Sequence, residues 1–277
     1  MKMKMKKYLH ILMCLSLILF AGMMASPHQA QAVPYLDGWT LDLSSYGGGT
    51  YTNIDRISVS GQSTVNQTFT TPGQLNVGDP FTEFGQLNQL NYYTEPGGAS
   101  NVHSFNIPGA GLYLDATGLT GEVTSVDNPA SPGATEFTYE FDQYPPGASI
   151  NLYLDDEGGE FDPSDGTGTT LATFRMYAGN GVGSPGFLTP GGQASNGTTS
   201  VQFEFETAMP GVFLNSSGQD LSTLGLPYYM FIDTNNQILI GNITFGPDGF
   251  TAAINSDGQA NVGVVPEPGT VLLLGLG

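Results

Sequence analysis

The chain has 277 residues, a formal net charge of −19 and an aromatic content of 11%. A chain this acidic is expected to repel nucleic acid and anionic lipid surfaces, which leaves divalent cations and neutral glycans as candidate partners. The aromatic residues are numerous enough to build a core, so we predict a folded protein rather than a disordered acidic one.

The first 32 residues predict export from the cell. Four lysines lie within residues 1–7, an apolar run follows over residues 8–24, and a small-x-small motif at Ala30 and Ala32 ends the segment. These three parts make a secretory signal peptide with a short signal helix, and we expect cleavage after Ala32. A membrane anchor is the alternative, but the apolar run is marginal in length for one.

Removal of residues 1–32 would leave little catalytic chemistry. The only cysteine, Cys14, and all four lysines would go, so that Arg56 and Arg175 become the only basic side chains beside 25 acidic ones. His103 would be the one remaining histidine, which does not favour a zinc site, and no nucleophile-elbow motif accompanies it. We therefore expect that the protein is not an enzyme and has no catalytic residues.

Residues 33–262 predict one all-β domain. Apolar and polar residues alternate over Glu136–Asp142 and Val201–Glu206, as in strands that face a core on one side and water on the other. Shorter runs rich in β-branched and aromatic residues predict strands at Ile57–Val59, Leu171–Tyr177, Tyr228–Ile232 and Ile238–Phe245. Pairs of turn residues separate the runs: Pro72-Gly73, Pro96-Gly97, Pro132-Gly133, Pro146-Gly147, Asp165-Gly166, Pro190-Gly191 and Asp257-Gly258. Many short strands between such turns indicate an antiparallel β-sandwich or jelly roll.

The segment 81–90 allows two predictions. Asp79-Pro80 could cap a helix, and the apolar residues that follow recur every three positions. Gly85 and the asparagines and glutamines around it weaken the helix prediction. We favour a strand here, and we expect no other long helix after the signal peptide.

A cluster of acidic residues, with glycines at 158, 159 and 166, precedes the predicted strand Leu171–Tyr177. Its carboxylates are Asp155, Asp156, Glu157, Glu160, Asp162 and Asp165. A hard cation such as Ca²⁺ takes about six to eight oxygen ligands, and a flexible acidic loop can supply them, although the spacing here is not that of an EF-hand. The sequence leaves two interpretations open: a weak calcium site, and a solvated acidic loop.

Two further patterns resemble functional motifs. The glycines of 181–186 fit G-x-G-x-x-G, but more glycine and proline follow where a helix should begin, so we interpret the match as chance. Glu204 and Glu206 share a strand face roughly 6–7 Å apart, which is near the separation of glycosidase carboxylates. Their alternation with phenylalanines is also that of a solvent-facing strand.

Sugar binding is a related alternative. One residue of Tyr92-Tyr93 and one of Tyr228-Tyr229 could serve as aromatic platforms, because adjacent strand residues point to opposite faces. A carbohydrate-binding or carbohydrate-cleaving β-sandwich therefore remains the alternative function.

The C-terminal segment 263–277 contains the most specific motif. Pro266, Glu267 and Pro268 are followed by Gly-Thr and a leucine-rich run too short to span a bilayer. These residues resemble the PEP-CTERM sorting signal, in which Pro-Glu-Pro precedes a transmembrane helix and terminal arginines. The resemblance implies that an exosortase, a membrane transpeptidase-like enzyme, recognises and processes the segment. Because most of the helix and the arginines are missing, we expect that the signal is truncated in this sequence.

A second resemblance covers parts of the predicted β domain. The segments 35–39, 63–69, 77–83 and 152–156 look like the flocculation-associated PEP-CTERM proteins. That subgroup implies a role in holding cells and matrix together in flocs or biofilm.

These patterns together predict a secreted protein of the cell envelope or extracellular matrix of a Gram-negative bacterium, with a structural or adhesive role. The expected partners are exosortase, exopolysaccharide or other matrix glycans, and divalent cations such as calcium, but not nucleic acid. We expect no required cofactor, and contact with the membrane only transiently, through the signal and sorting segments.

Overall fold

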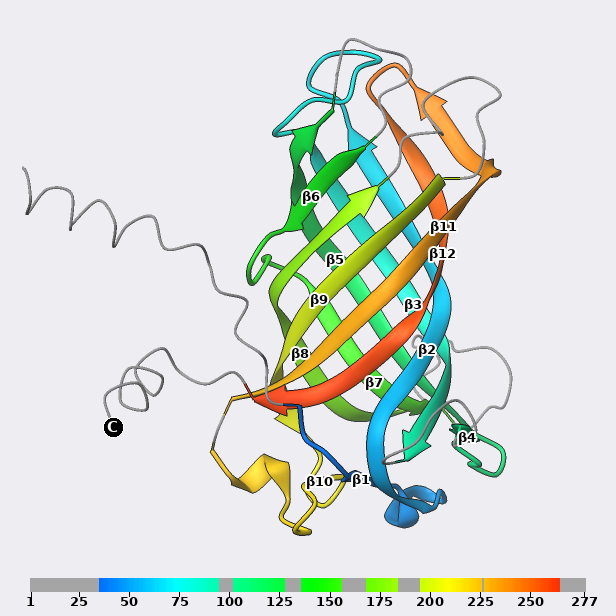
Figure 1. Cartoon of the computed structure of the whole chain (residues 1–277), viewed down its shortest axis with the longest axis vertical. Helices are drawn as coiled ribbons and strands as arrows, with labels where there is room; N and C mark the ends of the chain where they lie inside the picture. The colour runs from blue at the N-terminus through cyan, green and yellow to red at the C-terminus, as the bar shows by residue number, and fades with distance from the viewer. Residues whose placement is uncertain are drawn as a thin grey trace, which may run out of the picture. The chain divides into compact units, whose positions relative to one another are not determined.

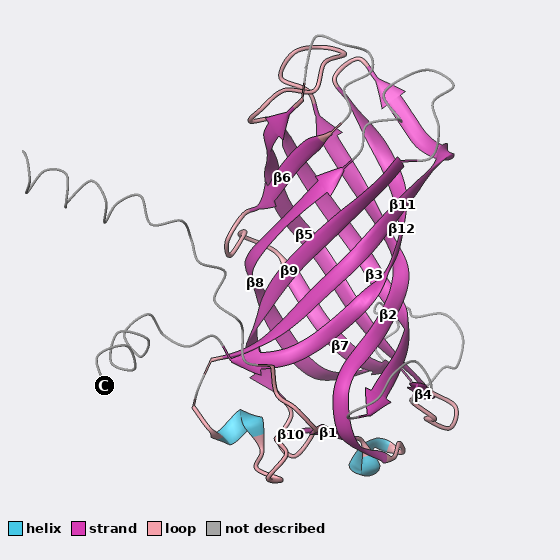
Figure 2. Ribbon diagram, viewed as in Figure 1, coloured by secondary structure: helices cyan, strands magenta, loops and turns pink. Residues whose placement is uncertain are grey.

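The described part of the protein is built mainly of β-strands (Figure 1). The computed structural model describes residues 35–94, 102–127, 136–155, 168–183, 195–225 and 227–264. Their strands are β1 Trp39–Asp42, β2 Thr50–Thr68, β3 Pro80–Thr94, β4 Val102–Ser104, β5 Gly111–Val126, β6 Phe137–Phe141, β7 Ser149–Asp155, β8 Thr169–Gly183, β9 Ser195–Ala208, β10 Phe213–Leu214, β11 Tyr228–Gly246 and β12 Gly249–Val264. Two short 3-10 turns, η1 Ser44–Tyr46 and η4 Leu221–Thr223, complete the described elements (Figure 2).

All twelve strands join one antiparallel sheet that closes on itself. The order β2-β12-β11-β9-β8 continues to β5 through β6 at one end of the strands and through β7 at the other, and then to β3. Strand β3 pairs back with β2 over most of its length, from Ile54↔Thr94 to Gln67↔Phe81. The sheet therefore encloses an interior, and alternate residues of each strand point into it.

The interior holds two clusters of buried apolar side chains. The larger one includes Ile57, Val59, Leu114 and Met230, and the smaller one, which includes Phe69 and Phe250, lies toward the other end of the strands. Ile57 and Val59 on β2 are 4% and 2% exposed, whereas the serines that alternate with them are not buried. This alternation is the sequence pattern of a strand with one apolar and one polar face.

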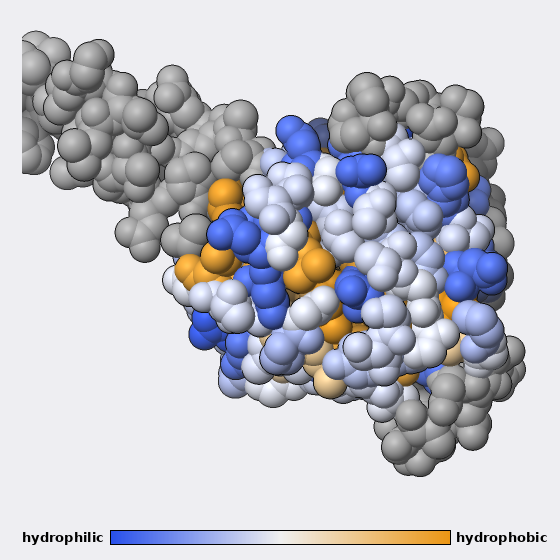
Figure 3. Space-filling view, turned by 90° about the horizontal axis from the view of Figure 1, so that it is seen from below, coloured by the Kyte–Doolittle hydropathy of each residue, from blue (hydrophilic) through white to orange (hydrophobic). Residues whose placement is uncertain are grey.

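Strands β1 and β10 close the lower end of the sheet, together with the two 3-10 turns (Figure 1). Trp39 and Phe213 stack with ring centroids 6.3 Å apart, and neither is more than 1% exposed. Hydrophobic residues lie between hydrophilic ones on the face seen from below (Figure 3). The only tryptophan thus belongs to the core, at the end where the chain enters the sheet.

Glycines of β8 make room for the aromatic side chains of β6. Phe137 pairs with Gly183, and Tyr139 pairs with Gly181. A Cβ atom on either glycine would overlap the ring of its partner. Gly181 and Gly183 are therefore strand residues that leave space for two interior rings. This packing accounts for the G-x-G spacing, so no phosphate-binding loop is needed to explain it.

The all-β, antiparallel prediction is confirmed. The segment 81–90 belongs to β3, so the strand that we favoured is confirmed. Asp79 is buried and does not cap a helix. Its carboxylate accepts hydrogen bonds from the backbone N–H groups of Thr70 and Asn76 at 2.9 and 2.7 Å, and so orders the turn before β3. The two packed sheets of a sandwich or jelly roll are not confirmed, since every described strand belongs to one sheet.

One predicted turn is wrong. Asp257-Gly258 lies in the middle of β12, where Gly258 pairs with Thr234 of β11 and Val59 of β2. A Cβ atom at Gly258 would overlap the backbone carbonyl oxygen of Asp233. The glycine is there because two backbones approach closely, and not because the chain turns.

The single strand β11 contains two of the predicted strands, Tyr228–Ile232 and Ile238–Phe245. Its register with β12 shifts between Ile238 and Ile243.

Two of the predicted turns, Pro72-Gly73 and Pro146-Gly147, do connect strands, and both glycines have positive φ angles. Among the described residues, none forms a helix with the length and hydropathy that a membrane-spanning helix requires.

Candidate functional site

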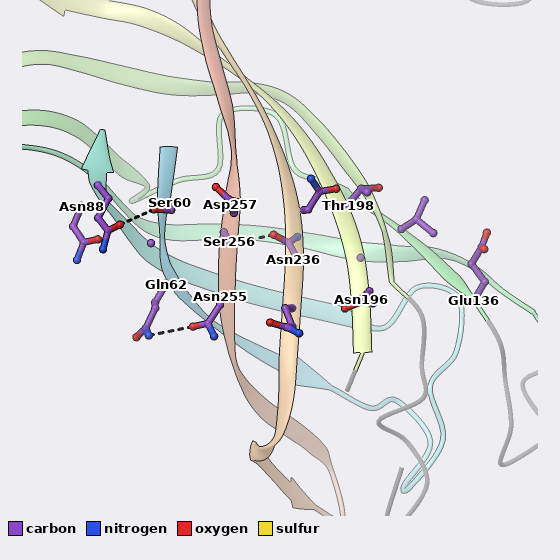
Figure 4. Close-up of a pocket in the computed structure, with 16 residues that line it drawn as sticks. Ser60, Gln62, Asn88, Glu136, Asn196, Thr198, Asn236, Asn255, Ser256 and Asp257 are labelled. Atoms are coloured by element: carbon purple, nitrogen blue, oxygen red, sulfur yellow. Dashed lines mark hydrogen bonds between the residues drawn. The ribbon is translucent and has the colours of Figure 1, made fainter. Parts of the chain in front are cut away.

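A broad polar groove of about 1010 Å³ lies on the outer face of β2, β9, β11 and β12 (Figure 4). Its side chains are mostly amides and hydroxyls. They include Ser60, Gln62, Asn88, Gln89, Glu136, Asn196, Thr198, Asn235, Gln237, Asn255 and Asp257. A groove with this lining offers many hydrogen-bond donors and acceptors and little net charge.

The register of five strands arranges these side chains in three parallel rows, which we call the polar rows. In the order β9, β11, β12, β2 and β3 they are Ser200, Asp233, Gln259, Ser58 and Asn91; Thr198, Asn235, Asp257, Ser60 and Gln89; and Asn196, Gln237, Asn255, Gln62 and Gln86. None of the fifteen side chains is buried. Neighbours within a row are about 4.8 Å apart and successive rows about 6.7 Å apart, as strand geometry requires.

Hydrogen bonds between strands hold part of this surface in place. Gln62 donates to the Asn255 side-chain carbonyl at 3.1 Å, and Ser60 donates to that of Gln89 at 3.3 Å. Each amide has two N–H donors and an oxygen with two lone pairs, so one such bond leaves most of its capacity for water or a ligand. The polar rows are therefore partly ordered before any ligand arrives.

A second groove of about 500 Å³ continues this surface. It shares Thr198 and Asn235 with the first and extends to Arg56 and Tyr93. The Arg56 guanidinium lies over the Tyr93 ring, 4.4 Å from its centroid. Tyr93, which we expected as a platform for a sugar, thus has a cation on its face.

An aromatic cluster adjoins the polar rows on the outer face of β8 and β11. Ring centroids lie 6.1 Å apart for Tyr144 and Tyr177, 4.9 Å for Tyr177 and Tyr229, and 5.5 Å for Tyr35 and Phe231. Tyr144 and Tyr35 are 42% and 44% exposed, whereas Tyr229 is only 6% exposed. Tyr229 is therefore covered, and the exposed rings of the cluster are Tyr35 and Tyr144.

Glu204, half of the carboxylate pair, has both oxygens engaged. Its Oε1 lies 3.0 Å from Nη2 of Arg175, and its Oε2 accepts a hydrogen bond of 2.8 Å from the Tyr144 hydroxyl. Burial, followed by the bond to Glu204, raises the pKa of Tyr144 to about 12. Glu206 is exposed on the same strand. The arrangement at Glu204 is that of a surface ion pair whose carboxylate oxygens both have partners.

Most residues of the predicted calcium loop lie outside the described residues, namely Asp156, Glu157, Glu160, Asp162 and Asp165. Asp155 ends β7 and is 3% exposed. In the part of the chain that the structure describes, no group of three or more His, Cys, Asp or Glu side chains could hold a metal ion. The calcium site stays a prediction.

The sorting and export residues also lie outside the described residues. They are Pro266, Glu267 and Pro268, and the expected cleavage motif at Ala30 and Ala32. No protein-family model matches the chain, and neither a curated protein nor a solved structure matches it significantly.

The polar rows are the candidate site that sequence reasoning missed. The alternation of Ser58, Ser60 and Gln62 indicates one polar strand face, as does that of Asn255, Asp257 and Gln259. What places these faces side by side is the pairing of β2 with β12, two strands separated by almost the whole domain. A single strand pattern contains no information on that pairing.

Proposed function

We propose that this protein is exported to the envelope or exopolysaccharide matrix of a Gram-negative bacterium, where it has a structural and adhesive role in flocculation or biofilm. The basic, apolar and small-residue pattern of residues 1–32 supports export. The Pro266-Glu267-Pro268 motif supports recognition by an exosortase, through its resemblance to PEP-CTERM signals.

The polar rows carry the adhesive part of the proposal. Neutral matrix glycans present hydroxyl groups along an extended chain, and a grid of amides and hydroxyls can bind several of them at once. The two grooves together have three acidic residues, Glu136, Asp233 and Asp257, and one arginine, Arg56, at one end. An uncharged polysaccharide is therefore a better partner for them than a strongly anionic one.

Each contact of this kind is weak, because a ligand hydroxyl must give up water to reach the protein. Many copies of the protein along one polysaccharide would turn weak contacts into firm adhesion. Cations bridging the acidic residues of 155–165 would add to cohesion, and no cofactor is required for the glycan contact itself.

The alternative function is a carbohydrate-binding or carbohydrate-cleaving module. The engaged oxygens of Glu204 favour binding over cleavage, because Arg175 and Tyr144 hold the carboxylate as an ion-paired anion. We propose no catalytic residue for this chain.

The proposal is tested by binding of the secreted protein to its host's exopolysaccharide. The double variant Gln62→Ala, Asn235→Ala removes one side chain from each of two polar rows, and we expect at least a tenfold loss of affinity. The double variant Thr173→Ala, Thr207→Ala is the control, because these two outer hydroxyls bond each other at 2.8 Å outside the groove. Equal affinity of the two variants would exclude the polar rows as the glycan-binding site. Release of reducing sugar would favour the carbohydrate-cleaving alternative.

The adhesive role has a separate test in the host. Deletion of the gene should disperse cell aggregates, and the wild-type gene should restore them. If divalent ions contribute, EDTA should weaken the aggregates and added Ca²⁺ should restore them. Aggregates that survive both the deletion and EDTA would refute the adhesive role.

A further inference from the structure

Two small cavities lie inside the closed sheet, on either side of Glu83. Their volumes are about 60 and 80 Å³, and Glu83 and Asn236 line both. Glu83 is on β3 between Phe81, which is 4% exposed, and Gly85, whereas the adjacent Phe84 is 47% exposed on the outer face. The carboxyl group of Glu83 therefore points to the interior.

Five other polar residues around the cavities form one hydrogen-bonded network. The Asn236 amide donates to the Thr199 hydroxyl at 2.5 Å, and the Tyr139 hydroxyl lies 2.6 Å from the same oxygen. Thr234 and Ser256 both donate to the side-chain carbonyl of Asn236 at 3.0 Å. This network explains why half-buried polar residues of β6, β9, β11 and β12 are tolerated in the interior.

Glu83 differs from this network because no side chain among the described residues supplies a cation to neutralise it. Its neighbour Ser63 is close enough to lower the pKa of the carboxyl, yet the Ser63 hydroxyl makes no hydrogen bond of good geometry. Both described arginines are engaged at the outer surface, Arg56 over Tyr93 and Arg175 with Glu204. Burial is the larger effect and raises the pKa of Glu83 to about 7.

Apolar side chains form much of the remaining lining, beside a few amides such as Gln67. Val65, Phe250 and Ile254 line the cavity on one side of Glu83, and Leu114 and Phe203 line the cavity on the other side. A dry apolar cavity of about 150 Å³ is known to admit benzene. The two cavities together approach that size, with a carboxyl group between them.

We propose that the interior of the sheet binds a small amphiphilic amine, whose ammonium group donates to Glu83 and whose short apolar body occupies the cavities. Gln62, Gln86 and Asn196 of the polar rows also line the cavities, but the ammonium site at Glu83 does not depend on the glycan contact. A cationic head supplies the charge that Glu83 lacks, and an alkyl body of a few carbons replaces water against the apolar walls. Burying the ion pair costs desolvation energy, so we expect affinity on the order of millimolar.

The pH dependence of binding follows from the same geometry. Among the described residues that line the cavities, Tyr139 is the only titratable group besides Glu83, and burial raises the pKa of its phenol above the ordinary value. Of these two cavity groups only Glu83 changes charge between pH 6 and 8, while an alkylamine stays protonated. Because the ionised carboxylate binds the amine, affinity should rise about tenfold over this interval.

The experiment compares n-butylamine with 1-butanol, which has the same length and no charge. Binding to the full chain is measured by calorimetry and by chemical-shift changes at pH 6 and 8. Wild-type protein should bind the amine more tightly at pH 8, and Glu83→Gln should lose this preference for amine over alcohol. Glu140→Gln is the matched control, because Glu140 is exposed on β6 next to Tyr139, and it should bind as wild type does.

Three outcomes would overturn the proposal: equal binding of amine and alcohol, amine binding that is unchanged in Glu83→Gln, and occupation of the cavities by water only. The wild-type pH profile keeps the test decisive even if Glu83→Gln folds poorly. None of these outcomes bears on the polar rows, since the glycan test leaves Glu83 unchanged.

Discussion

At the scale of single residues, Glu83 determines how stability should depend on pH. Its folded pKa of about 7 lies above the ordinary value of 4.5, because burial disfavours the charged form. The neutral form therefore stabilises the fold fully below about pH 4.5, and this contribution is lost as pH rises toward and through 7. We expect wild-type protein to lose about 3 kcal/mol of unfolding free energy over this interval relative to Glu83→Gln.

Urea denaturation at pH 4.5, 6 and 8 measures this difference. The comparison with Glu83→Gln removes the general effect of a strongly acidic chain, whose self-repulsion also grows with pH. Glu140→Gln, the exposed control, should follow the wild-type curve. Parallel curves for wild type and Glu83→Gln would mean that the Glu83 carboxyl is well solvated.

A second residue-scale prediction concerns the outer ion pair. Glu204→Gln keeps the size of the side chain but removes the charge that Arg175 and Tyr144 share. Because the Arg175 side chain is 46% exposed, we expect a loss of only about 0.5–1 kcal/mol in unfolding free energy. The phenol pKa of Tyr144, followed by ultraviolet absorbance in a difference titration against Tyr144→Phe, should fall from about 12 toward 10. An unchanged titration would show that the bond to Glu204 does not contribute.

At the scale of elements, the sequence predicted strands better than their ends and partners. The alternation over Val201–Glu206 predicted part of β9, because Val201 and Phe203 face a core while Glu204 and Glu206 face outward. The Asp257-Gly258 pair was wrongly predicted as a turn. A glycine that is needed because two backbones lie close together cannot be distinguished in the sequence from a glycine that is needed for a turn. The polar rows could not be predicted, because their alignment depends on pairings between distant strands.

Gly258 provides the element-scale test. Gly258→Ala places a Cβ atom against the carbonyl of Asp233 in the adjacent strand, so β11 and β12 must move apart. We expect a loss of about 1–3 kcal/mol of unfolding free energy, measured by urea denaturation. Gly246→Ala is the control, because a Cβ there would be no closer than 3.7 Å to any neighbour. A turn at Asp257-Gly258 would instead make the two substitutions similar.

At the scale of the whole molecule, closure of the sheet links its parts into one folding unit. Pairing of β2 with both β3 and β12 leaves no free edge between them, and the larger core cluster joins Trp39 of β1 to Met230 of β11. Loss of any one long strand would open the interior to water and expose both clusters. Such a structure should unfold in a single cooperative step.

Trp39 makes this cooperativity measurable, because it is the only tryptophan and is fully buried at the lower end of the sheet. Its fluorescence reports on β1 and β10, while far-ultraviolet circular dichroism reports on all strands. We expect the two signals to change at the same urea concentration, with native emission at short wavelength. If Trp39 became exposed at lower urea, β1 and β10 would be a separately stable plug, and the interior would open before the sheet unfolds. In that case amine access to Glu83 should increase at the same urea concentration, since the plug closes one end of the interior.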